Sequence, residues 1–298
     1  MIQPNYLQKG DTVAIVSTAR KIASDQIIAA IKLLEKWGLN VVIGNTIGLE
    51  IHQFAGNDEA RINDFQQMLK NPKVKAIWCA RGGYGTVRLV DKLDFSAFKK
   101  HPKWIIGYSD ITVLHSHIHN LGVETLHATM PINIVNNSKE ALETLKKSLF
   151  GKNLSYEIPT SENNKLGSAA GEIVGGNLSV LYSLLGSKSS IKTDGKMLFI
   201  EDLDEYLYHV DRMMMQLEYK GLLKQLKGLV VGSMTKMKDN DIPWGKDALE
   251  IIEDAMKPYA IPLVFDFPAG HIPDNRALIF GSKVVLEVNK DKTKLVFE

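Results

Sequence analysis

The chain has 298 residues, of which 45% are hydrophobic and 23% charged, a composition typical of globular proteins that excludes a fibrous or intrinsically disordered chain. Its 36 Lys and Arg residues and 34 Asp and Glu residues give a net charge of +2. This balance does not favour nucleic acid or an anionic membrane as the partner, so we expect a small-molecule or peptide ligand. The single cysteine, Cys79, excludes an internal disulfide, and the chain has neither a signal-peptide pattern at its start nor a long uncharged apolar run, so we expect a cytoplasmic protein.

Apolar strand patterns alternate with helical patterns in the first half of the chain. Strands are predicted over residues 12–17, 40–44, 74–80 and 103–108. One helix is predicted over 24–37 with Ser24 as its cap, and another after Asn57, with Asp58 and Glu59 in its first turn. This alternation predicts an α/β fold with a doubly wound, mostly parallel sheet and helices on both faces. Ligands bind such sheets at the carboxyl ends of the strands.

A polar, turn-rich stretch over residues 151–168 separates this half from the rest of the chain and predicts a linker. We therefore expect an N-terminal domain over 1–150 and a strand-rich α/β domain over 169–298. Within the second domain, strands are predicted around 197–200, around 229–232 and from 277 onward, and helices around 178–185, 210–220 and 248–256.

The sequence Ile105-Ile106-Gly107-Tyr108-Ser109-Asp110 places a serine directly after a buried strand and before a helical pattern. A glycine two positions before the serine permits the tight turn of a nucleophile elbow, which lifts a serine hydroxyl out of the sheet. The second glycine of that motif is replaced by Ile111. In the alternative interpretation, Ser109 or Asp110 only caps the following helix.

A second glycine-rich turn, Ala80-Arg81-Gly82-Gly83-Tyr84-Gly85-Thr86, also follows an apolar strand. It lacks the Lys-Ser/Thr ending of a P-loop and the spacing of a dinucleotide-binding fingerprint, so its backbone N–H groups favour an oxyanion hole. Alternatively, the glycines serve only turns with positive φ.

A serine nucleophile needs a base, and the chain offers eight histidines. His271 lies in a loop directly after an apolar run, where α/β scaffolds present catalytic groups. Glu201, at the exit of a predicted strand, is placed to orient a histidine, whereas Asp202 points to the opposite face of that strand. The acidic residues around Glu201 are alternatively a solvated loop. The order Ser109, Glu201, His271 matches the order of the triad in α/β-hydrolases.

Taken together, these motifs resemble the LD-carboxypeptidase family of serine peptidases, which includes the muramoyltetrapeptide carboxypeptidases and the related microcin immunity peptidases. The resemblance extends over nearly the whole chain. It is carried, in order, by residues 9–16, 55–61, 80–85, 107–110, 175–178, 200–202, 210–213 and 270–271.

This resemblance implies a two-domain serine peptidase with its active site in the cleft between the domains. The catalytic triad would be Ser109, Glu201 and His271, and the oxyanion hole would be formed by the main-chain N–H groups of Gly83 and Asp110. The resemblance implies no metal or organic cofactor, and it implies a homodimer. The expected reaction, in peptidoglycan recycling, is hydrolysis of the bond between an L-centre, diaminopimelate or lysine, and the terminal D-alanine of murein tetrapeptides.

One departure from the family pattern lies after Glu201, where Leu-Tyr-His-Val-Asp-Arg over 207–212 replaces the frequent Pro-Tyr-Arg-Ile-Asp-Arg. His209 in place of an arginine is expected to alter how a substrate carboxylate is held, and a peptidyl-nucleotide antibiotic is the alternative substrate. Two readings from other classes are a non-catalytic peptide-binding module, against which the complete triad argues, and a zinc hydrolase using His115 and His119.

Overall fold

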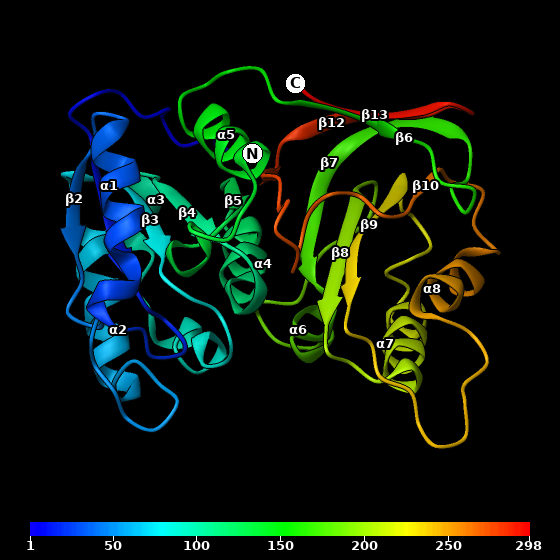
Figure 1. The fold of residues 1–298 in the computed structure, drawn as a ribbon, viewed down its shortest axis with the longest axis horizontal. Coiled ribbons are helices and arrows are strands. Elements are labelled where there is room, and N and C mark those ends of the chain that lie inside the picture. The colour runs from blue at the N-terminus through cyan, green and yellow to red at the C-terminus, as the bar shows by residue number, and fades with distance from the viewer.

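The computed structural model describes all residues, Met1–Glu298, and divides into two halves, each built on one sheet (Figure 1). The N-terminal sheet has six strands in the order β11-β5-β4-β3-β1-β2, parallel except for β11, which runs antiparallel to β5. Its strands are β1 (Thr12–Val16), β2 (Asn40–Ile43), β3 (Val74–Cys79), β4 (Trp104–Gly107), β5 (Thr125–His127) and β11 (Leu278–Phe280). Its helices are α1 (Ile28–Lys36), α2 (Asp58–Lys70), α3 (Ser96–Lys100), α4 (Thr112–Asn120) and α5 (Lys139–Leu149).

Helices cover both faces of this sheet because successive strand residues point to opposite sides and both sides are apolar. Val13 and Ile15 belong to the same buried cluster as the apolar residues of α1 and α5, whereas Ala14 and Val16 belong to the cluster formed with α2, α3 and α4. The predicted doubly wound arrangement is therefore confirmed in this half of the molecule.

The C-terminal sheet has seven strands in the order β10-β9-β8-β7-β12-β13-β6. Strands β7 to β10 are parallel to one another, and the remaining pairs are antiparallel. The strands are β6 (Ser155–Pro159), β7 (Gly167–Asn177), β8 (Met197–Leu203), β9 (Gly228–Thr235), β10 (Leu263–Val264), β12 (Lys283–Val288) and β13 (Lys292–Phe297). The helices are α6 (Leu178–Ser183), α7 (Leu207–Tyr219) and α8 (Ala248–Met256), all packed on one face.

The other face of the C-terminal sheet joins the N-terminal half in a shared core. Trp78 and Ile106 of the first sheet lie in one continuous buried cluster with Phe199 and Val230 of the second. Helix α4 lies between the two sheets (Figure 1) and packs against β7 and α6. Because apolar burial is the main favourable term in folding, this core holds the carboxyl ends of both sets of parallel strands in a fixed relation.

Two strands do not follow the predicted domain boundaries. Strand β6 falls inside the predicted linker 151–168 and forms the edge of the C-terminal sheet. Only alternate residues of this strand face inward, so its low apolar content resembles that of a loop. Strand β11, assigned to the second domain, instead completes the N-terminal sheet beside β5, because the chain crosses back after the loop that carries His271.

The predicted helix starts are confirmed at one helix and wrong at another. Asn57 caps α2, its side chain accepting from the Ala60 N–H at 2.8 Å. Ser24 is not a cap: it opens a 3₁₀ turn, and α1 begins only at Ile28.

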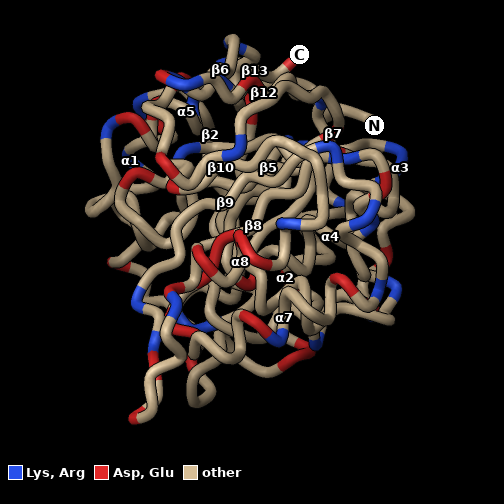
Figure 2. Tube along the Cα trace, turned by 90° about the vertical axis from the view of Figure 1, so that its right-hand side faces the viewer, with Lys and Arg blue, Asp and Glu red and all other residues tan.

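Charged residues of both signs are interspersed over the side of the molecule in Figure 2, in keeping with the net charge of +2. No helix has the length and apolar content needed to cross a membrane.

Candidate active site

Ser109 lies at the end of β4 in a strained turn. Its φ of +63° is unusual for a residue with a side chain and is typical of a nucleophile elbow. The turn is this tight because of Gly107, where a Cβ would lie 2.8 Å from the Ile111 side chain. Neither Ser109 nor Asp110 makes a side-chain cap to the helix that follows. The interpretation of these residues as helix caps is therefore wrong.

The glycine-rich turn packs directly against this elbow. A Cβ on Gly82 would lie 3.0 Å from the Ser109 Cβ, so the backbone approaches the serine as only glycine allows. The buried Asp110 carboxylate fixes the turn by accepting the Thr86 N–H at 2.9 Å. Burial raises the pKa of this carboxyl, although the hydrogen bonds from Thr86 oppose the shift. The main-chain groups of Gly83 and Asp110 thus belong to segments in contact, and their role as an oxyanion hole stays a prediction.

Glu201 and His271 form a hydrogen-bonded pair at the carboxyl end of the second sheet, with the carboxylate buried and the imidazole partly exposed. The His271 Nδ1 lies 2.6 Å from the Glu201 Oε2, and Glu201 is fully buried on β8. The loop reaches the carboxylate because of Gly270, where a Cβ would lie 2.8 Å from that same oxygen. Burial alone would lower the pKa of His271, but the charge of Glu201 and its hydrogen bond raise it above the ordinary value.

The two halves of the predicted triad meet through Tyr108. Its ring centroid is 4.9 Å from that of His271, so the histidine lies beside the residue that precedes Ser109. The Ser109 hydroxyl and the imidazole do not hydrogen-bond to each other in this structure; the side-chain bond of His271 goes to Glu201. Such catalytic bonds often form only once substrate is bound.

Asp202 points away from His271, as the alternation along a strand predicts. Its carboxylate accepts from the Asn177 Nδ2 and from the Ser179 N–H, both at 2.8 Å. Burial, together with the neighbouring charge of Glu201, raises the pKa of Asp202 to about 7. Asp202 therefore fixes the start of α6, a role that the sequence did not reveal.

A hydrogen bond between the two halves of the molecule links this region to the serine. The N–H of Asn177 donates to the Thr112 hydroxyl at 3.0 Å, in the first turn of α4. Both residues are buried. At the neighbouring Gly176 a Cβ would overlap the same hydroxyl, so the two backbones approach this closely only with glycine there.

Replacing Thr112 with valine is expected to lower the free energy of unfolding by about 1–3 kcal/mol, because the buried Asn177 N–H loses its acceptor. Thr112→Ser keeps the hydroxyl and is expected to retain most of the bond. Urea denaturation of the three proteins measures the difference. Equal stability of the valine and serine variants would contradict the importance of this bond.

The histidines weighed as a zinc pair make separate contacts. His115 has both ring nitrogens within hydrogen-bond distance of protein oxygens, the Thr125 hydroxyl at 2.8 Å and the Gly107 carbonyl at 2.9 Å. Burial lowers its pKa to about 4. His119 instead contacts Glu172. No group of three or more His, Cys, Asp or Glu side chains is arranged to hold a metal ion.

Sequence reasoning did not single out His127, which lies near the candidate site. This fully buried residue ends β5, directly opposite Gly107 of β4, and its ring lies 5.8 Å from that of Tyr108. Neither ring nitrogen has a hydrogen-bond partner. Its position at the carboxyl end of a parallel strand is the signal that could have identified it.

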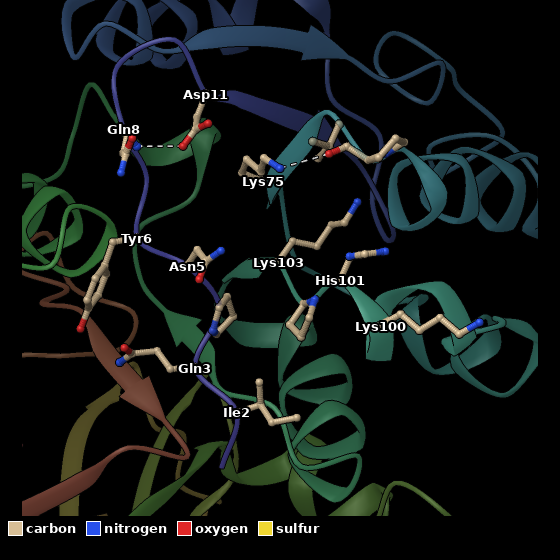
Figure 3. Close-up of a pocket in the computed structure, with 14 residues that line it drawn as sticks. Ile2, Gln3, Asn5, Tyr6, Gln8, Asp11, Lys75, Lys100, His101 and Lys103 are labelled. Atoms are coloured by element: carbon tan, nitrogen blue, oxygen red, sulfur yellow. Dashed lines mark hydrogen bonds between the residues drawn. The ribbon is translucent and has the colours of Figure 1, made fainter.

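A surface pocket of about 650 Å³ lies elsewhere (Figure 3). It is lined by the N-terminal segment and by residues next to the amino ends of β3 and β4, whereas Ser109 follows the carboxyl end of β4. Lys103 in its wall donates to the main-chain oxygens of Met68 and Asn71, so this lysine fixes the end of α2.

The fold and the site define a two-domain α/β protein with a serine on a strained elbow and a hydrogen-bonded histidine–carboxylate pair nearby. Residues 13–128 match the family model for the LD-carboxypeptidase N-terminal domain, and residues 170–286 match that for the C-terminal domain. The chain belongs to the LD-carboxypeptidase family, so the resemblance inferred from its motifs is confirmed.

Individual relatives match over almost their full length. The chain is 35% identical to a probable murein peptide carboxypeptidase of Bacillus subtilis, over 99% of this chain and 94% of that protein. It is 30% identical to a murein tetrapeptide carboxypeptidase of Pseudomonas aeruginosa, over 93% and 94%. The crystal structure of a muramoyltetrapeptide carboxypeptidase from Oxalobacter formigenes superposes with a TM-score of 0.87 at 28% identity, covering 96% of this chain and 98% of that one.

Proposed function

We propose that this protein is a serine-type LD-carboxypeptidase that removes the terminal D-alanine from murein tetrapeptides in the cytoplasm. The observation that carries the proposal is the His271–Glu201 pair, with its 2.6 Å hydrogen bond, beside the elbow that presents Ser109. Relatives with murein peptides in their names support the substrate class. The proposed partner is a small peptide rather than a nucleic acid, and the proposed reaction uses no metal or organic cofactor.

In the proposed mechanism, the Nε2 of His271 takes the proton of the Ser109 hydroxyl while the oxygen attacks the carbonyl carbon before D-alanine. Glu201 stays ionised and accepts the Nδ1–H, which leaves Nε2 free to act as the base. The tetrahedral intermediate then collapses, and His271 returns the proton to the departing amine of D-alanine. A water molecule, deprotonated by the same histidine, hydrolyses the acyl-enzyme and frees the tripeptide.

The main-chain N–H groups of Gly83 and Asp110 are proposed to stabilise the oxyanion of that intermediate. Loss of a single donor in such a hole costs about 2.7–4 kcal/mol of barrier. The Asp110 carboxylate stabilises this arrangement, because its bond to the Thr86 N–H holds the glycine-rich turn against the elbow.

Mass spectrometry of peptide digests tests the proposal. Wild-type protein is expected to convert L-Ala-γ-D-Glu-diaminopimelate-D-Ala to the tripeptide and free D-alanine, and to leave the diastereomer ending in L-alanine intact. Running the lysine-containing peptide in parallel identifies the third residue that the enzyme accepts. If neither tetrapeptide is cleaved while a peptidyl-nucleotide is, the proposed substrate class is wrong and the antibiotic-cleaving alternative is correct.

A further inference from the structure

Two arginine side chains lie beside the glycine-rich turn without a carboxylate partner. The aliphatic part of Arg20 covers Gly83 so closely that a Cβ there would overlap the Arg20 Cδ. Arg81, two residues before Gly83, donates from Nη1 to the Lys21 main-chain oxygen at 3.2 Å. Neither guanidinium takes part in an ion pair, and the neighbouring Lys21 is paired with Glu50.

Like charges without a counter-ion are an unfavourable arrangement for the free protein. Arg81 bonds to the main-chain oxygen of Lys21, the residue after Arg20, and the Arg20 N–H bonds to the oxygen of Gly82, the residue after Arg81, so the two side chains start from adjoining backbone. Burial lowers the pKa of Arg81, and the charge of Arg20 lowers it further. Arg20 is exposed and Arg81 half-buried. An anion bound between them would remove this repulsion, and a guanidinium is the group best suited to grip a carboxylate with two parallel hydrogen bonds.

The position of the two arginines relative to Ser109 indicates which anion would bind between them. Gly82 contacts Ser109, and Gly83, the next residue, carries Arg20 on its surface. In a peptide cleaved before its last residue, the terminal carboxylate lies one residue beyond the attacked carbonyl, a separation of about 3.6 Å in an extended chain. A carboxylate-binding group for such a peptide must therefore lie next to the oxyanion-binding turn.

We propose that Arg20 and Arg81 together form the binding site for the C-terminal carboxylate of the peptide substrate, an inference that rests on the proposed function. The site explains how an acyl-transfer centre would select the last peptide bond rather than an internal one. His209 is not part of this site, because its Nδ1 lies 2.6 Å from the Glu205 carboxylate.

Two substrates that differ only at the carboxylate test the site: the tetrapeptide ending in D-alanine and the same peptide ending in D-alanine amide. Wild type is expected to prefer the acid in kcat/KM by about tenfold to a hundredfold, the range for a charge-assisted hydrogen bond. Arg20→Gln is expected to lose that factor on the acid and to cleave the amide as wild type does.

Arg81→Lys provides a second variant, because it keeps the positive charge and removes the planar fork. It is expected to show a smaller loss, again confined to the acid. Arg88→Gln is the matched control: this exposed arginine follows the same turn but is paired with Asp58 at 2.7 Å, so its loss is expected to leave the acid-to-amide ratio unchanged.

Two results would overturn the inference while leaving the proposed function intact: an Arg20→Gln variant that keeps the wild-type preference for the acid, or one that loses activity equally on both substrates. If the wild-type protein cleaves neither the acid nor the amide, the proposed function itself fails. The two failures are thus distinguished in one experiment.

Discussion

Replacing Ser109 with alanine is expected to reduce D-alanine release by about a million-fold, the size of effect seen when a triad nucleophile is removed. The reason is chemical, because no other hydroxyl occupies the elbow and His271 would have no proton to accept. Single-turnover and steady-state release of D-alanine, followed by mass spectrometry, measure the loss. Turnover close to wild type would remove Ser109 from the mechanism.

The same variant is expected to fold and melt much as wild type does. The Ser109 hydroxyl forms no hydrogen bond that holds the fold, and alanine meets the same strain as serine at a φ of +63°. Ser109→Gly is expected to be more stable than wild type by up to about 1 kcal/mol and equally inactive, because glycine adopts this conformation without penalty.

A matched control lies one helix away. The buried Ser116 of α4 donates its hydroxyl proton to the Ser189 main-chain oxygen at 2.6 Å. Ser116→Ala is expected to lose about 1 kcal/mol of stability and to keep its turnover. The opposite behaviour of the two serines would separate a catalytic hydroxyl from a structural one.

Much of this arrangement follows from local sequence patterns. The strand ending at Gly107 predicts where the chain turns, and the following Ser109 is presented as the elbow pattern indicates. The strand exit at Glu201 and the loop at His271 are both signals of the carboxyl end of a sheet, and the structure brings those two residues into contact. Each of these signals lies within a short segment, which is why it could be predicted, whereas the pairing of Glu201 with His271, 70 residues apart, was implied only by the resemblance to the family.

The features that were missed depend on long-range packing. Strand β11 has an apolar pattern that fits either sheet, and only the assembled core places it beside β5. Asp110 was expected to contribute its N–H, but its carboxylate holds Thr86, 24 residues earlier. The side chain of Arg20 reaches the glycine-rich turn because the loop after β1 places its aliphatic part over Gly83. No local pattern encodes these contacts.

Replacing Glu201 with glutamine is expected to lower kcat by about ten-thousand-fold, the effect known for the corresponding change in a serine-protease triad. The glutamine amide is nearly the same size, so the buried site should stay filled. It can donate a hydrogen bond to the Nδ1 of His271, which would place the ring proton on Nε2 and prevent that atom from accepting the serine proton. The folded protein is not expected to suffer, because a neutral amide costs less to bury than a carboxylate.

The pH dependence of kcat/KM provides a second, independent test of the role of Glu201 in the same variant. In wild type, Glu201 raises the pKa of His271 above 6.5, so kcat/KM should fall as the pH decreases through a value above 6.5, where the base becomes protonated. In Glu201→Gln both contributions of Glu201 to the pKa of His271 are lost; burial, the largest influence, still favours the neutral ring, and only the smaller effect of the Asp202 charge opposes it. The residual activity should therefore persist to lower pH than in wild type. An unchanged acid limb would show that Glu201 does not hold the catalytic base. The neighbouring Asp202→Asn is the control: Asp202 bonds to Asn177 and Ser179 on the opposite side of the strand, so this variant is expected to keep most of the activity and to move the acid limb less than Glu201→Gln, because the charge of Asp202 is the smaller influence on His271.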